Sequence, residues 1–244
     1  MRRATFPFAF PLEVNEILRR RSFILTRLCG QDEGFCTIPV SGMKEATLDA
    51  LLHLYDDIFF EGYLTQSMGC LHVTLSSRLT SSAGKFLCTR GAFRQIKGAE
   101  IRMSSDFLMR LHEGPFQLNG LSVATPQEAF LVVFEHELCH ALETALYGQT
   151  GHSARFLSLT KGLFGHTATR HSLPTRRQEA ARDGLLVGSH VCFPFRGSML
   201  SGVVNYIGKQ ATVMVPDARG EYRDRRGQRY TKYRVPLDHL KRIP

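Results

Sequence analysis

The sequence predicts an α+β protein, in which helices pack on a small sheet and a small all-β domain follows. Three observations predict this class: apolar residues at helical spacing over 44–60, a helix-capping signature at Thr125 that precedes a long apolar run, and short alternating segments after residue 185. The 244 residues, 43% of them hydrophobic, suffice for a medium domain plus a small one.

The chain is expected to divide into four regions. These are an N-terminal arm at 1–43, an α+β domain at 44–172, a linker at 173–184 and a basic barrel domain at 185–244. The first region shows no sustained period and contains Gly30, Gly34 and Pro39, which favours an arm or a short hairpin.

A helix followed by short strands is expected in the first half of the α+β domain. Leucines and aromatic residues recur at three- and four-residue steps over 44–60, which places them on one helix face. Alternation at 71–75 predicts a strand, and the turn at 81–84 leads to further strand candidates at 85–88 and 101–103. We expect the helix to pack on this sheet.

The strongest local signal is a capping box. Thr125, Pro126 and Glu128 provide an N-cap, a first-turn proline and a capping acid, so a helix is expected to begin at Thr125 or Pro126. The unbroken apolar run over 129–134 predicts that this helix is buried on all sides, and glycines end it after Tyr147. A second helix is predicted over 152–164.

The sequence of the last region predicts short strands at 189–195, 200–207, 210–215 and 230–235, separated by turns. This pattern predicts a small barrel. The region from residue 185 onward contains eleven lysines and arginines but only four acidic residues. Its net charge is therefore +7, most of the +9 of the whole chain. Such a charge favours a polyanionic partner, nucleic acid above all, and it is equally typical of a solvated basic surface.

The six cysteines include no CxxC pair, so neither a disulfide framework nor a thiolate zinc ribbon is expected. The amino terminus makes a poor signal peptide because prolines and arginines interrupt it, and no apolar run has transmembrane length. We expect a cytoplasmic protein with reduced thiols and no membrane association.

A metal-binding motif lies within the predicted buried helix. His136 and His140 are four residues apart, which brings both imidazoles to one face of a helix, where they can bind one tetrahedral Zn²⁺. Glu137 between them is placed to act as general base on a water. Cys139 faces away and reads as a small buried apolar residue.

A catalytic zinc site needs a third protein ligand. The candidates that follow in the chain are Glu143, His152, His166, His171 and Glu179. The sequence favours His152, with His166 second, because His152 follows a glycine-bounded loop and begins a helix that can return antiparallel to the first.

The stretches from His136 to Ala141 and from Gly151 to Phe156 resemble the HExxHA and GHGxxF elements of the SprT-like metallopeptidases, which include Spartan-type DNA-protein crosslink proteases. The resemblance covers about residues 44–166 and includes the turn at 81–84 and the strand at 101–104. It implies a zincin-like fold, Zn²⁺ as cofactor, His152 as third ligand beside His136 and His140, and Glu137 as catalytic base.

The sequence departs from that pattern in two ways. Ser153 stands where the family usually has glycine, and the zinc-ribbon cysteines that follow the peptidase in many relatives are absent. The basic region in their place resembles small SH3-like or KOW-type barrels, which bind proteins as well as nucleic acids.

These features predict a zinc-dependent endopeptidase acting on protein substrates, including DNA-associated or DNA-crosslinked proteins, with DNA bound through the basic barrel. Two alternatives stay open. One is a DNA-binding or regulatory protein whose zinc site is structural or vestigial, and the other is a peptidase whose barrel recruits a protein partner.

Overall fold

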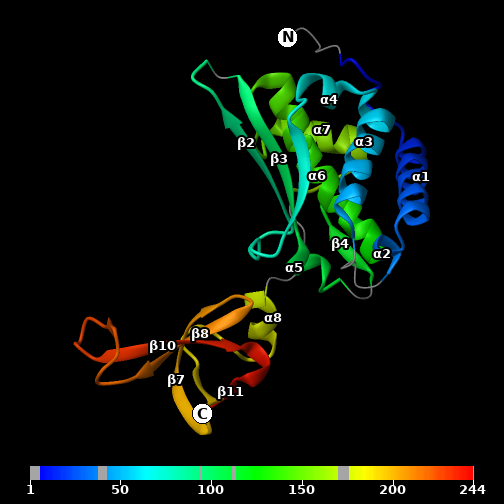
Figure 1. Ribbon diagram of the computed structural model, residues 1–244. Coiled ribbons are helices and arrows are strands. Elements are labelled where there is room, and N and C mark those ends of the chain that lie inside the picture. Colours follow the sequence, from blue (N-terminus) through cyan, green and yellow to red (C-terminus); the bar gives the residue numbers. More distant parts are fainter. Residues whose placement is uncertain (1–5, 38–42, 94, 112–113, 170–175, 244) are drawn as a thin grey trace. The chain divides into compact units, whose positions relative to one another are not determined.

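Figure 1 shows the computed structural model of the chain, which describes residues 6–37, 43–93, 95–111, 114–169 and 176–243. The chain divides into two compact units, Met1–Leu173 (unit 1) and Pro174–Pro244 (unit 2), and each has its own hydrophobic core. The mixture of helices and small sheets confirms the predicted α+β class. Within the described ranges, no helix has the length and apolar character that a membrane crossing requires.

Unit 1 is built of helices and short strands. In chain order they are α1 (Val14–Gln31), α2 (Glu33–Cys36), α3 (Glu45–Phe60), α4 (Tyr63–Ser67), β1 (Leu71–Ser76), β2 (Gly84–Arg90), β3 (Ile96–Ser104), α5 (Ser105–Leu108), β4 (Phe116–Leu118), β5 (Leu121–Val123), α6 (Pro126–Tyr147) and α7 (Ala154–Phe164). The helices and strands expected over 44–164 are present, with their ends shifted by a few residues.

The sheet of unit 1 has the order β1-β3-β2, with β1 parallel and β2 antiparallel to the central strand β3. Helix α3 packs against β1, and α6 packs against β2 and β3 (Figure 1). Helix α7 returns along α6, and α1 packs against α3 and α6. This arrangement buries α6 between the sheet and other helices, while β2 stays at the edge of its sheet.

The N-terminal region differs from the expected arm. Helix α1 contributes Ile24 and Leu28 to the core, and Phe35 of α2 is also fully buried. Phe35 packs its ring against Phe130 of α6 at a centroid distance of 5.8 Å. This helix was hard to foresee because no side chain caps α1 and its middle turn is three consecutive arginines.

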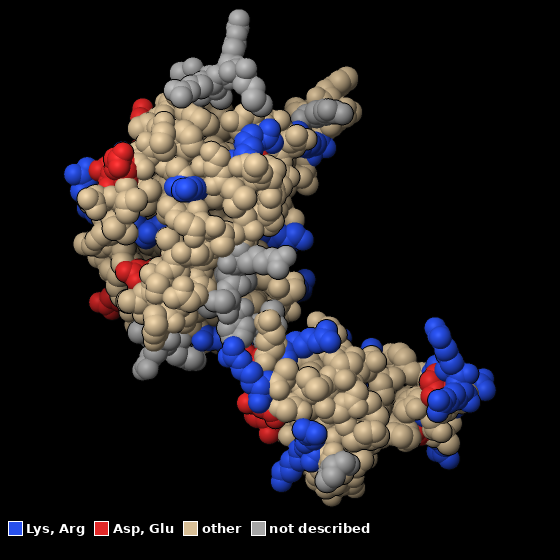
Figure 2. Space-filling model, turned by 180° about the vertical axis from the view of Figure 1, so that it is seen from behind, with Lys and Arg blue, Asp and Glu red and all other residues tan. Residues whose placement is uncertain are grey.

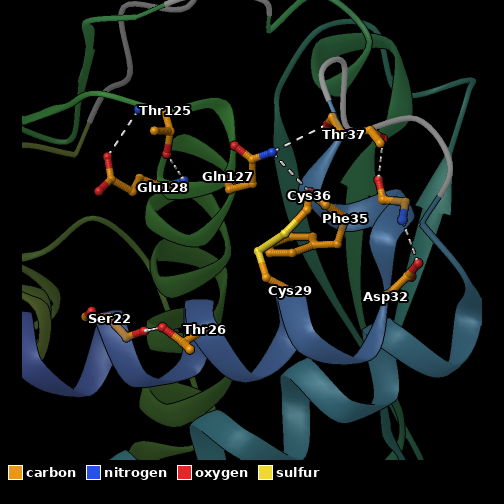
Figure 3. Close-up of a disulfide and its surroundings, with 11 residues drawn as sticks. Ser22, Thr26, Cys29, Asp32, Phe35, Cys36, Thr37, Thr125, Gln127 and Glu128 are labelled. Atoms are coloured by element: carbon orange, nitrogen blue, oxygen red, sulfur yellow. Dashed lines mark hydrogen bonds between the residues drawn. A yellow bond between two sulfur atoms is a disulfide. The ribbon is translucent and has the colours of Figure 1, made fainter.

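A disulfide joins Cys29 to Cys36, which corrects the expectation of reduced thiols at these two positions. The bridge connects the last turns of α1 with α2 (Figure 3). Beside it, the Gln127 amide of α6 donates hydrogen bonds to the carbonyls of Phe35 and Thr37. The sequence did not reveal this pairing. The two cysteines come together because α1 ends at Asp32 and the chain changes direction there before α2 begins.

Unit 2 consists mainly of one antiparallel sheet. Its elements are α8 (Arg176–Arg182), β6 (His190–Phe195), β7 (Ser198–Ile207), β8 (Gln210–Pro216), β9 (Tyr222–Arg223), β10 (Arg229–Pro236), the short 3-10 helix η1 (Leu237–His239) and β11 (Lys241–Arg242). The strand order is β11-β6-β7-β8-β10-β9. The four strands predicted after residue 185 are present, and among the described residues β9 and β11 form the two edges of the sheet.

The segment expected as a linker, 173–184, includes helix α8. Ala180 on this helix is buried in the core of unit 2, together with Val191 and Val213 of the sheet. The polar composition that suggested a linker instead reflects a short helix with one apolar contact face.

Candidate metal centre

Helix α6 begins and ends as its sequence predicts. The Thr125 hydroxyl accepts a hydrogen bond from the Glu128 backbone N–H at 3.2 Å, and the Glu128 carboxylate accepts one from the Thr125 N–H at 3.1 Å. Gly148 ends the helix in the left-handed conformation, at φ 72°. The helix is thereby held at both ends, and its middle turns carry the candidate site.

Three histidines meet beside α6. The rings of His136 and His140 lie 4.9 Å apart between centroids, as expected for one helix face, and Nε2 of His136 approaches Nε2 of His152 to 3.0 Å. His152 lies in the loop just before α7. One ligand nitrogen from each of the three residues lies within 4.8 Å of the others, so the group could hold a metal ion.

The ring of Phe156, fully buried on the first turns of α7, underlies all three imidazoles. It stacks on His140 at 4.3 Å and lies 5.0 Å from His136 and 5.1 Å from His152 between ring centroids. The sequence indicates that Phe156 faces inward, but it does not show that this ring supports the cluster, because the packing of α7 on α6 decides it.

The cluster lies in a pocket of about 460 Å³ between α6, the loop 148–153 and β2. Ser82, Gly84, Lys85 and Phe86 line the β2 side of this pocket. Glu137 also lines it, with its side chain against Gly84, and a backbone hydrogen bond connects it to Phe86. The glutamate and the three histidines therefore face the same space.

Burial controls the protonation of these groups. It raises the pKa of Glu137 to about 7, and the hydrogen bond from Phe86 opposes that rise. It lowers the pKa of His140 to about 4, and the neighbouring His152 acts in the same direction. A neutral imidazole is the form that binds a metal, and a carboxyl with a pKa near neutrality can both accept and release a proton.

The other candidate ligands lie elsewhere or have other partners. The carboxylate of Glu143 accepts hydrogen bonds from the Gly151 N–H at 3.0 Å and from Arg155 Nε at 2.8 Å. His166 is fully buried and directs Nε2 to Glu135 at 3.0 Å. His171 lies outside the described residues, and Glu179 belongs to α8 of unit 2.

The donor set fits zinc. Two nitrogens bound to one tetrahedral zinc at its usual distance lie roughly 3.3 Å apart, close to the 3.0 Å between His136 and His152. A metal ion held by these three imidazoles would keep a fourth coordination position open toward the pocket. The Glu137 carboxyl group lines the same pocket. Chemically, this arrangement can hold a metal ion next to a group that moves protons.

Comparison with known protein families shows a match over the region that carries the histidine cluster. The model of the SprT-like family matches residues 48–177, more than half of the chain, from α3 to the start of α8. No curated protein matches the sequence.

Proposed function

Because the chain belongs to the SprT-like family, we propose that it is a zinc-dependent endopeptidase that cleaves protein substrates. The cluster of three imidazoles beside a buried glutamate in an accessible pocket carries this proposal. His136, His140 and His152 are the metal ligands, and Glu137 is the general base. Zinc, when bound, supplies the Lewis acidity that activates a water and polarises the scissile carbonyl.

Glu137 moves the proton in this scheme. Its carboxylate takes a proton from the attacking water as the new carbon–oxygen bond forms, and returns a proton to the amide nitrogen as the carbon–nitrogen bond breaks. The pKa of about 7 that burial gives Glu137 supports both steps near neutral pH. The low pKa of His140 keeps that imidazole neutral over the same range.

The position of β2 supports an extended peptide as substrate. β2 is an edge strand of the described sheet, and its residues Gly84, Lys85 and Phe86 line the pocket. An edge strand offers backbone N–H and C=O groups to another extended segment, and pairing of this kind recognises a backbone without demanding one side-chain sequence. A substrate segment paired with β2 would pass beside Glu137.

Substitution of Glu137 by Gln tests the function. The variant should keep its zinc, because the ligands are unchanged, and lose proteolysis of an unfolded model protein by about 10²- to 10⁴-fold, the usual contribution of a general base. Zinc content by mass spectrometry and cleavage on gels are the measurements. Glu45→Gln, at an exposed position on α3, is the matched control and should behave as wild type. Equal activity of Glu137→Gln and wild type, with zinc bound, would refute this mechanism.

We further propose that unit 2, taken as an SH3-like or KOW-type barrel, binds DNA and brings the peptidase to DNA-associated proteins. Figure 2 shows Lys and Arg side chains gathered at one end of this unit. Strand β9, the first residue of β10 and the turns beside β9 contribute five arginines: Arg219, Arg223, Arg225, Arg226 and Arg229. Within the described part of unit 2, no ion pair neutralises these arginines.

The nearby acids have structural roles instead. Asp217 accepts hydrogen bonds from the Arg219 N–H at 2.9 Å and the Thr231 hydroxyl at 2.7 Å. Asp224 accepts from the N–H groups of Arg226 and Gln228, both at 2.9 Å. Both carboxylates thus hold turns, which leaves the arginine charges available for phosphates.

A salt titration tests the DNA proposal. In the full chain, Arg225→Gln combined with Arg226→Gln should weaken binding to a duplex of arbitrary sequence and reduce the slope of log affinity against log salt by about 0.9 for each lost phosphate contact. Arg19→Gln with Arg27→Gln, on α1, is the charge-matched control. If affinity and slope are unchanged by the unit 2 pair, DNA is not the ligand of this surface. Co-purification of one specific protein would then favour a protein partner.

A further inference from the structure

The loop between α6 and α7 contacts the cluster of three histidines and lines the same pocket. Oγ1 of Thr150 lies 2.7 Å from Nδ1 of His140. Because Nδ1 is engaged in this contact, Nε2 is the ring nitrogen of His140 that remains for a metal. Either the hydroxyl or the imidazole could donate the proton in a contact of this length, so the direction of the hydrogen bond depends on the other neighbours of Thr150.

Glu143 is the neighbour that sets this direction. Its carboxylate is fully buried and accepts from the Gly151 N–H and from Arg155. Burial alone would raise the pKa of Glu143. Hydrogen bonds from Arg155, the Thr150 side chain and the Gly151 N–H outweigh burial and hold this pKa below its usual range. Glu143 is therefore an ionised carboxylate, which can only accept hydrogen bonds.

The direction of both hydrogen bonds follows from the chemistry of a hydroxyl. Thr150 has a single O–H hydrogen, and towards Glu143, its other side-chain partner, this hydrogen can only be donated, because an ionised carboxylate has none to give. The Thr150 oxygen must then accept at His140, so Nδ1 carries a hydrogen and Nε2 presents its lone pair to the cluster. Two hydrogen bonds therefore connect Glu143 to His140 through the Thr150 hydroxyl.

We propose that Thr150 is a positioning residue that fixes the tautomer and the ring orientation of His140 for metal binding. This inference rests on the proposed zinc site. Partners of ligating histidines typically change metal affinity 10- to 100-fold when removed, because the free ring must otherwise be ordered by the metal itself. Arg155 and the Gly151 N–H hold Glu143 in place for this role.

Two substitutions separate the hydroxyl from the shape of the side chain. Thr150→Val is nearly isosteric and has no hydroxyl, whereas Thr150→Ser keeps it. In competition with a chromogenic chelator, the Val variant should bind Zn²⁺ roughly 10- to 100-fold more weakly than wild type, and the Ser variant should stay within about threefold. Thr26→Val, at an exposed threonine of α1, is the control and should match wild type.

A nitrogen-15 spectrum of the zinc-loaded wild type provides a second readout, in which His140 should show a protonated Nδ1. Wild-type affinity in Thr150→Val, or an unprotonated Nδ1, would overturn the proposal while leaving the peptidase assignment intact. Equal losses in the Val and Ser variants would overturn it as well, since shape alone would then be responsible. Failure of the wild type to bind zinc would instead remove the proposed function on which it rests.

Discussion

At the level of single residues, the position of the proposed base Glu137 depends on Gly84, the glycine that begins β2 and lies against its side chain. A Cβ atom on Gly84 would lie 2.7 Å from Cγ and 2.8 Å from Oε1 of Glu137, nearer than side-chain carbons approach such atoms. Gly84 therefore lets the strand backbone pass directly beside the glutamate. A larger residue there would displace the carboxyl group and leave the three histidines in place.

The substitution Gly84→Ala is expected to lower proteolysis about 10- to 100-fold, because small displacements of a catalytic group have effects of that size. Zinc content should stay at the wild-type level, since the residue contacts Glu137 and none of the ligands. Peptide cleavage rates and metal analysis on the same preparation are the measurements. Gly30→Ala, where a Cβ atom meets nothing within 4 Å, is the matched control. Full activity of the Gly84→Ala variant would contradict this placement of Glu137.

At the level of elements, α1 is joined by a buried ion pair to α6, the helix that carries two of the candidate metal ligands. Arg21 donates two hydrogen bonds of 2.7 Å to the carboxylate of Glu135, which is fully buried and precedes His136 in α6. Tyr55 of α3 also donates to Glu135, at 2.8 Å. Burial alone would raise the pKa of Glu135. Arg21 and His166 outweigh burial and hold this pKa at about 2, so the carboxylate is ionised.

Removal of Arg21 should therefore destabilise unit 1. We expect Arg21→Met to lower the free energy of unfolding by about 3 to 5 kcal/mol at pH 7, because it leaves a buried carboxylate without its cation. The paired state stabilises the fold above the ordinary glutamate pKa of 4.5 and is lost as pH falls toward 2, so the deficit should shrink at pH 4. Urea unfolding at both pH values measures it.

Arg19→Met provides the comparison on the same helix, because Arg19 is 77% exposed and solvent screens its pair with Glu16, so its loss should change the free energy of unfolding far less. Equal effects of the two substitutions would mean that α1 is not anchored through Glu135. Combining Arg21→Met with Glu135→Gln should recover part of the loss, since no buried charge is then left unpaired.

At the level of the whole molecule, the two units have separate cores, and the proposed metal site involves unit 1 alone. A ligand that binds only the folded state stabilises it by about 2.7 kcal/mol at a hundredfold excess over its dissociation constant. Metal therefore should stabilise one of the two units and leave the other unaffected.

Chelation of the metal should lower the unfolding temperature of unit 1 by about 5 to 10 °C and leave the transition of unit 2 in place. Calorimetry of the full chain with and without a chelator measures both. Glu137→Gln, which keeps the ligands, should show the same shift, and His140→Ala should show none. An equal shift in both transitions, or in neither, would contradict a metal site confined to unit 1.

Much of this architecture was predictable because it depends on residues close in the chain. The capping box joins residues three apart, and the two candidate ligands on α6 are four apart, so their geometry follows from helix periodicity alone. His152 could be favoured as third ligand for a similar reason, since a short loop limits where α7 can lie. The strands of unit 2 followed from alternation in the same way.

The tertiary structure decided everything that depends on contacts between distant segments. Gly84 meets Glu137, and Arg21 meets Glu135, only because β2 and α1 pack on α6. The role of α1, the pairing of Cys29 with Cys36 and the contact of Thr150 with His140 each depend on packing or on the path of a loop. Sequence by itself determined the candidate ligand pair of α6 and the helix that carries it, because the four-residue spacing and the local capping hydrogen bonds place both histidines on one helix face. Only the packing determined which residues surround them.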